Sequence, residues 1–232
     1  MCVRLLLLAL SILCLLPGLA LAQECPRADR PRVRVEVRQD NPQVFTSYDI
    51  RGLNGMRNNR ESAGGSNEHV PLGLATAQVT YQMSMQARVA TLPNGNTCVS
   101  PAEVVIEYAF SNTGIYIASE IPIGSCSYSR VEEHERRHVE VDGQLLREWQ
   151  FRLQQEAEYA VQNVGVIWSH DQSNAVEQLK SRISTSIKQS AETMMNERNR
   201  RQAQVDTRME YDRISRSCGG EVQRIVRRAM GN

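Results

Sequence analysis

A short motif with two histidines lies near the middle of the chain: residues 134–138 read HERRH, which fits H-E-x-x-H. Side chains four residues apart lie on one face of a helix, so two imidazoles at this spacing can bind one metal ion. The glutamate between them can take a proton from a metal-bound water, and zinc lowers the pKa of such a water to about 7. The motif predicts His134 and His138 as zinc ligands and Glu135 as the catalytic general base.

Charged residues surround this motif and allow a second interpretation. Glu133, Arg136 and Arg137 lie beside the histidines, whereas the stricter zinc-protease signature has uncharged residues at these positions. The same charges suit a solvent-exposed helix in which Glu and Arg pair at i, i+4. Ser129 followed by Glu132 is a capping-box pattern, which predicts that a helix begins just before the motif. Both interpretations place the motif on a helix and differ in whether its histidines bind zinc.

A catalytic zinc site requires a third protein ligand and a position for water. Glu158 lies 20 residues after His138, which is the spacing at which thermolysin-like enzymes return a glutamate to the metal. That return requires a turn, which only Gly143 favours. On one continuous helix Glu158 would instead lie about 30 Å away, at 1.5 Å per residue. Asp142 lies one turn beyond His138, too far along the helix axis to share the metal.

The other two histidines lie in segments that read as loops. His69 follows the glycine-rich stretch SAGGSNE, and His170 belongs to WSHD, which precedes the second predicted helix. Loops collect polar surface residues and functional residues alike. A surface position and metal binding therefore remain alternatives for both histidines.

The hydrophobic patterns predict an α+β fold, with strands first and helices after. Residues 31–122 alternate as strands, and the stretches ATAQVTYQMSMQARVAT and PAEVVIEYAF form a long hairpin around an Asn94-Gly95 turn in an antiparallel sheet. From Ser129 the apolar spacing becomes helical, and a second helix runs from about residue 173 to residue 216. We expect one domain over residues 23–165 and a C-terminal helical extension over residues 166–232 that packs on it.

The first 22 residues have the features of a secretory signal peptide. Arg4 supplies the positive n-region, residues 5–16 are apolar, and Ala20-Leu21-Ala22 is an A-x-A cleavage site. No later segment approaches the roughly 20 apolar residues that a membrane span needs. We therefore expect a mature chain from about Gln23 that is periplasmic or secreted.

Charge and cysteines agree with an exported protein that does not bind nucleic acid. The chain has 27 basic and 26 acidic side chains, and removal of Arg4 leaves the mature part near zero net charge, which argues against phosphate-driven binding. Cleavage also leaves four of six cysteines, an even number that predicts two disulfides with three possible connectivities. We expect Cys98 with Cys126 and Cys25 with Cys218, although four free cysteines remain an alternative.

The order of these features resembles a bacterial family of predicted secreted zinc-dependent proteases. The matching stretches are YDIRGLNGMRNNR, AQVTYQMSMQ, GNTCVSPAEVVIEY and VEEHERRHVEV, in that order. Tyr48, Gly52 and Cys98 occupy family positions together with the H-E-x-x-H residues. The resemblance implies a zincin-like fold, a Zn²⁺ cofactor and a peptide or protein substrate, which an edge strand beside the metal helix would hold by β-addition.

Family members carry a later Tyr-Asp followed by Thr-x-His-Gly. Tyr211 and Asp212 match the first pair, but Ser217 or Cys218 stands where relatives have the histidine. The resemblance thus adds Cys218, as a thiolate, to Glu158 and His170 as candidates for the third ligand. The alternatives are a structural zinc with four protein ligands, and a catalytically degenerate zincin-scaffold protein of the cell envelope that acts in binding or assembly.

Overall fold

The computed structural model describes residues 25, 29–58 and 70–231 of the chain. The predicted signal peptide and His69 lie outside these residues. The elements follow in this order: β1 (Arg32–Gln39), β2 (Gln43–Phe45), α1 (Ile50–Asn58), β3 (Gly73–Thr91), β4 (Thr97–Ile117), α2 (Cys126–Val164), β5 (Ile167–Ser169), α3 (Gln172–Val205), α4 (Arg208–Arg216), a 3₁₀ turn (Cys218–Gly220) and α5 (Glu221–Met230). The predicted α+β class is confirmed.

The long hairpin predicted from alternating apolar residues is formed by β3 and β4, which pair antiparallel from Gly73–Ile117 to Thr91–Thr97. The sheet as a whole is mixed, so the predicted antiparallel sheet is wrong. β1 and β2 lie along the other side of β4 and run parallel to it. β5 pairs antiparallel with the first residues of β4. Alternation indicates which residues share a face, but it does not indicate which strand is the neighbour or in which direction it runs.

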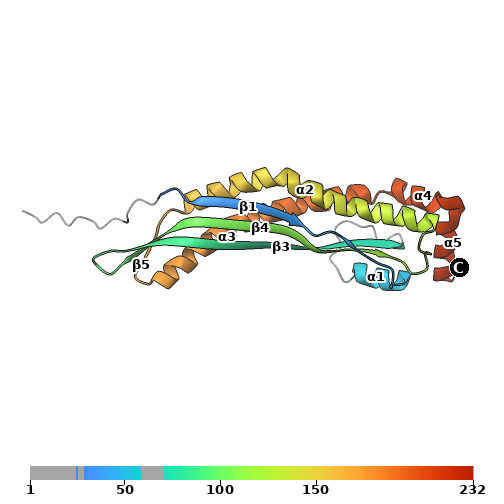
Figure 1. The fold of residues 1–232 in the computed structure, drawn as a ribbon, viewed down its shortest axis with the longest axis horizontal. Helices are drawn as coiled ribbons and strands as arrows, with labels where there is room; N and C mark the ends of the chain where they lie inside the picture. The colour runs from blue at the N-terminus through green and yellow to red at the C-terminus, as the bar shows by residue number, and fades with distance from the viewer. Residues whose placement is uncertain (1–24, 26–28, 59–69, 232) are drawn as a thin grey trace, which may run out of the picture.

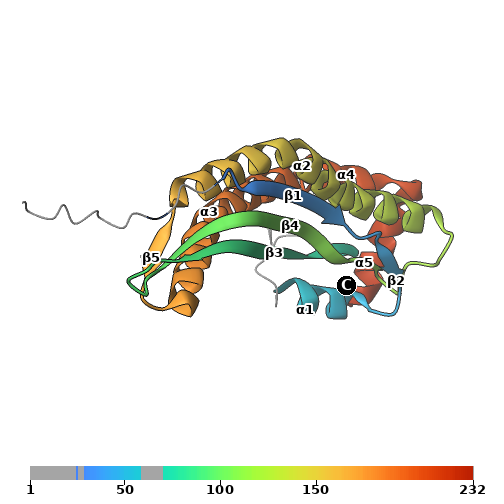
Figure 2. The ribbon, with the colours of Figure 1, turned by 60° about the vertical axis from the view of Figure 1, so that its left-hand side comes forward.

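Two long helices, α2 and α3, lie side by side on one face of the curved sheet (Figures 1 and 2). The apolar positions of β4 alternate toward them, and the helices contribute their own apolar stripes to the same core. The members of this core with little or no exposure include Val104, Ile106, Tyr108, Phe110, Leu145, Leu153, Leu179, Ile183 and Ile187. Helix α3 therefore packs on α2 and on the sheet within one hydrophobic core.

A second apolar cluster lies at one end of the molecule, where α1, α4 and α5 gather (Figure 2). It joins Leu53 of α1 and Ile117 of β4 to Val131 of α2 and Ile214 of α4, all of them buried. Val131 precedes the H-E-x-x-H motif by one helical turn. This cluster therefore fixes the motif against α4, which follows α3 in the chain.

Helix α2 is continuous over 39 residues and begins at an N-cap formed by Ser125, whose side chain accepts a hydrogen bond from the Tyr128 amide. The predicted cap at Ser129 is thus one turn late. Gly143 does not break the helix. A Cβ at this position would meet the side chain of Gln39, whose amide donates to the Val139 carbonyl at 2.8 Å. Gly143 allows β1 to approach the helix closely.

The four cysteines of the described chain form two disulfides, Cys25–Cys98 and Cys126–Cys218. The predicted connectivity is therefore wrong. Cys98 is the second residue of β4, and Cys126 follows the far end of that strand, so about 19 strand residues at 3.3 Å each separate the two cysteines. Cys126–Cys218 instead joins the start of α2 to the 3₁₀ turn that follows α4.

Within the described ranges, no helix combines the length and the apolar character that crossing a membrane requires.

Candidate metal centre

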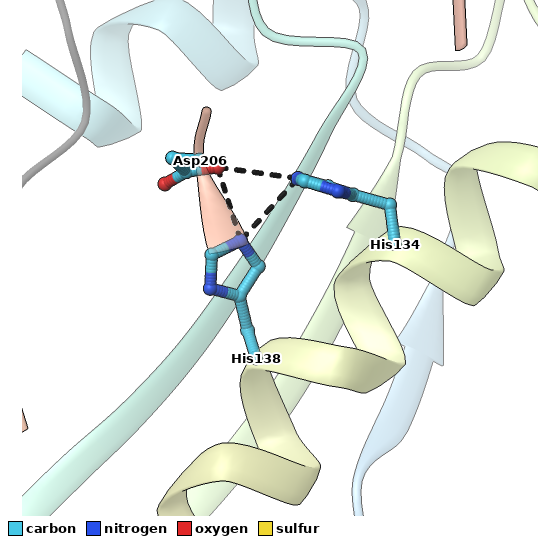
Figure 3. Close-up of side chains that lie close together, drawn as sticks. All are labelled: His134, His138 and Asp206. Atoms are coloured by element: carbon cyan, nitrogen blue, oxygen red, sulfur yellow. Dashed lines mark hydrogen bonds and ion pairs between the residues drawn. The ribbon is translucent and has the colours of Figure 1, made fainter. Parts of the chain in front are cut away.

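Three side chains from two distant parts of the chain converge beside the start of α2. Nε2 of His134 and Nε2 of His138 are 3.3 Å apart, and each lies 3.2 Å from Oδ1 of Asp206. Figure 3 shows the two imidazoles leaving successive turns of α2 and pointing toward the same carboxylate oxygen. Among the residues that the structure describes, these three form the cluster that could hold a metal ion.

The dimensions of this triangle fit a small metal ion. Tetrahedral bonds of 2.0–2.1 Å, which are typical of zinc with nitrogen or oxygen ligands, place neighbouring ligand atoms about 3.3 Å apart. The three observed separations, 3.2, 3.2 and 3.3 Å, agree with that spacing. His134 and His138 are mostly buried, with side-chain exposures of 6% and 13%. The alternative prediction of a solvent-exposed charged helix is therefore wrong for the face of α2 that carries the two histidines.

Asp206 is the residue that the sequence analysis missed. The predicted helix of residues 173–216 is in fact two helices, and Asp206 forms the break between α3 and α4. The side chain of Thr207 accepts a hydrogen bond from the Glu210 amide and so caps α4. Thr207 and Glu210 match the Ser/Thr-x-x-Glu capping box, a signal that would have located the break and a carboxylate within it.

The three candidates for a third ligand lie away from the cluster or are unavailable for coordination. Glu158 is 20 residues beyond His138 on the same continuous helix, about 30 Å along its axis. His170 follows β5 beyond the far end of α2, where its ring contacts Trp168 with centroids 5.2 Å apart. Cys218 is bonded to Cys126, so it supplies no thiolate.

Glu135 lies next to the cluster and is 5% exposed. Its carboxylate accepts a hydrogen bond from the backbone amide of Ala75 in β3. Burial raises the pKa of Glu135 above its usual range, against the opposing effects of His138 and His134. Glu135 therefore packs between α2 and the first residues of β3, and its burial makes the carboxylate a stronger base.

β3 can pass this close to Glu135 because residue 73 is a glycine. A Cβ built at Gly73 would lie 2.7 Å from Cγ of Glu135, inside the normal contact distance. We expect Gly73→Ala to destabilise the protein by about 1–3 kcal/mol, as overpacked sites do, by pushing Glu135 and β3 apart. Urea unfolding of the metal-free protein measures this effect.

Gly55→Ala is the matched control for Gly73→Ala, because a Cβ at Gly55 in α1 meets no atom within 4 Å. In a helix that change is expected to be neutral or to stabilise by up to about 1 kcal/mol. Equal stability of the two variants would contradict the close packing of β3 on Glu135.

The charged residues of the motif have two different surroundings. Arg136 pairs with Glu132 one turn earlier on an exposed face, with nitrogen and oxygen 2.5 Å apart. Arg137 instead pairs with Glu210 of α4, and Oε1 of that glutamate lies 3.6 Å from Nδ1 of His134. One arginine therefore belongs to the solvent side of α2, and the other connects the motif to the helix that follows Asp206.

The electrostatics of the cluster favour a negative Asp206. Burial raises the pKa of this carboxyl, but hydrogen bonds with His134 and His138 outweigh that effect and hold the pKa well below its usual range. Burial likewise lowers the pKa of His138, yet the hydrogen bond and charge of Asp206 and the charge of Glu135 raise it to about 9. The carboxylates of Asp206 and Glu135 thus stabilise positive charge on or near the two imidazoles.

A cavity of about 740 Å³ adjoins the cluster. Its walls include the first residues of β3, from Gly73 to Gln78, and the faces of α2 and α3 that carry the site. Tyr211 of α4 also lines it, and its phenol donates a hydrogen bond to Oδ1 of Asp206 at 2.9 Å. His134, His138, Asp206 and Glu135 therefore border a space that can admit another molecule.

Comparisons of the chain with protein-family models, curated proteins and solved structures found no match.

Proposed function

We propose that this protein is an exported zinc-dependent metallopeptidase. The observation that carries the proposal is the triangle formed by His134, His138 and Asp206, with Glu135 buried beside it. Two histidines and one carboxylate form a catalytic zinc ligand set that leaves a position for water or substrate. The resemblance to secreted zinc-dependent proteases points to the same activity, and Asp206 would supply a third ligand in place of the relatives' histidine.

Zinc in such a site supplies a water of lowered pKa and polarises the carbonyl that is attacked. The residues of the chain then have separate roles. Glu135, whose pKa is raised by burial, takes the proton of the attacking water and can pass it to the leaving amine. Tyr211 holds Asp206 in place through its phenol hydrogen bond.

A set of two histidines and one carboxylate is also used by non-haem iron enzymes. Two features favour zinc and hydrolysis here. The histidines come from one helix at i and i+4, and the residue directly after the first is a buried glutamate suited to act as a general base. Metal analysis distinguishes the two possibilities directly.

A peptide substrate is supported by the strand that borders the cavity. Within the described part of the chain, β3 pairs with β4 alone, so no strand lies along its other edge. The first residues of this edge strand, Gly73–Gln78, line the cavity next to Glu135. An extended peptide can add to such an edge through main-chain hydrogen bonds, which would place one of its peptide bonds beside the site.

Export is supported by two disulfides, which persist in oxidising compartments. We propose that the mature chain works in the periplasm or outside the cell, after cleavage near residue 22. The non-catalytic alternative rested on the lack of a third ligand. The position of Asp206 removes that reason and favours the peptidase.

Metal analysis of the purified mature protein tests the proposal. We expect about one zinc per chain in the wild type and almost none in His134→Ala or His138→Ala. His170→Ala, at the other end of α2, is the matched control and should keep its zinc. Equal zinc content in all four proteins, or iron in place of zinc, would contradict the proposed function.

A further inference from the structure

A buried glutamine on α3 contacts the Nδ1 side of His138, the side of the ring that faces away from Asp206. Gln202 is 4% exposed, and its amide Oε1 forms a hydrogen bond with Nδ1 of His138. Its amide nitrogen donates to the backbone carbonyl of His138 at 3.0 Å and to Oδ1 of Asp142 at 2.6 Å. All the polar atoms of this side chain thus have partners, and two of those partners belong to His138.

These contacts determine which ring nitrogen of His138 carries the hydrogen when the imidazole is neutral. A carbonyl and a carboxylate can only accept, so the NH₂ group of Gln202 must face them and Oε1 must face the imidazole. Because Oε1 is itself an acceptor, Nδ1 of His138 has to carry a hydrogen. A neutral His138 therefore keeps its Nε2 lone pair directed at the triangle.

Asp142, the partner that orients Gln202, is itself fixed. It is 3% exposed, and Arg198 of α3 binds both of its oxygens at 2.7 Å in a bidentate pair. The guanidinium of Arg198 also lies 5.1 Å from the ring centroid of Phe110, a buried residue of β4. A continuous chain of contacts therefore leads from the sheet core through Arg198, Asp142 and Gln202 to a metal ligand.

We infer that Gln202 is a positioning residue for the metal centre, held by the Asp142–Arg198 pair, which orients the His138 ring and fixes its metal-binding tautomer. This inference rests on the proposed zinc site. Metal-bound histidines generally donate their other ring N–H to a fixed acceptor, often a carboxylate, and loss of that acceptor costs about 10–100-fold in metal affinity or activity. In this protein the neutral amide of Gln202 accepts from Nδ1 of His138, and the carboxylate of Asp142 in turn accepts from that amide.

Zinc affinity, measured by competition with a chelator, tests the inference. Gln202→Met keeps the length of the side chain but loses its acceptor, and we expect a 10–100-fold weaker affinity. Gln202→Glu keeps an oxygen that can accept from Nδ1 of His138, but its second oxygen would face two other acceptors, the His138 carbonyl and Oδ1 of Asp142, so this variant should also bind zinc more weakly than the wild type. Gln189→Met, on an exposed position of α3, is the control and should bind as tightly as the wild type.

A nuclear magnetic resonance measurement separates positioning from general packing. In the wild type, the Nδ1–H of His138 should exchange slowly with water and be visible, both with zinc and without it. The resonance should disappear in Gln202→Met and persist in Gln189→Met. Its absence from the wild type, or wild-type zinc affinity in a folded Gln202→Met protein, would overturn the inference. A wild-type protein that binds no zinc but shows this resonance would count against the proposed function alone.

Discussion

Glu135→Gln is expected to lower the rate of peptide hydrolysis by about 10²–10⁴-fold, the usual contribution of a general base. The substitution is nearly isosteric, and the amide oxygen of glutamine can still accept the hydrogen bond from the Ala75 backbone amide. The ligand triangle does not include residue 135. Zinc content should therefore stay at about one per chain while turnover is lost, which a peptide-cleavage assay and metal analysis of the same sample can measure.

Glu140→Gln is the matched control for this experiment, because Glu140 lies on the same helix but is exposed. It should leave both zinc content and turnover unchanged. Hydrolysis by Glu135→Gln within a few-fold of the wild-type rate would show that another group takes the proton. Loss of zinc from this variant would instead mean that Glu135 contributes to metal binding.

The sequence predicted those features of the fold that depend on local spacing. The hairpin of β3 and β4 followed from alternate apolar residues, because a period of two places every second side chain on one face. The direction in which β1 meets β4 did not follow, because the two strands are separated by β2, α1 and β3 in the chain. The predicted disulfide pairing was wrong for the same reason, because Cys25–Cys98 and Cys126–Cys218 join residues 73 and 92 positions apart in the chain.

In the candidate site, too, the residues set by local spacing were predicted, and the residue brought in by tertiary packing was not. His134, Glu135 and His138 were predicted because one helix at 3.6 residues per turn determines how they lie. Asp206 lies 68 residues after His138, and only the packing of α3 and α4 on α2 brings it to the histidines. The thermolysin-like spacing to Glu158 failed because Gly143 serves the close approach of β1, so α2 continues where that interpretation needed a turn.

The position of Asp206 has consequences for how zinc and folding are coupled. Two ligands come from α2 and the third from the break between α3 and α4, so a bound ion would join helices that are distant in the chain. The disulfide Cys126–Cys218 connects the same two regions on the other side of α4. By the chain-entropy argument, a covalent link across about 92 residues restricts the unfolded chain and favours the folded arrangement of these ligands before metal binds.

Asp206→Asn is expected to abolish the stabilisation of the protein by zinc. A ligand at 100 times its Kd stabilises the folded state by about 2.7 kcal/mol, which corresponds to a rise in Tm of roughly 5–10 °C for a chain of this size. Asparagine keeps the shape of the side chain and can accept the hydrogen bond from Tyr211, but it lacks the charge that a zinc ligand provides here. Thermal unfolding with and without zinc measures the difference.

The matched control for this substitution is Asp212→Asn, six residues further along and exposed beside Arg216. That variant should gain as much Tm from zinc as the wild type, whereas Asp206→Asn should gain almost none. If Asp206→Asn kept the full zinc-dependent rise, the third ligand would have to be another residue. If no other residue proved to supply that ligand, a site with two protein ligands would favour the non-catalytic alternative.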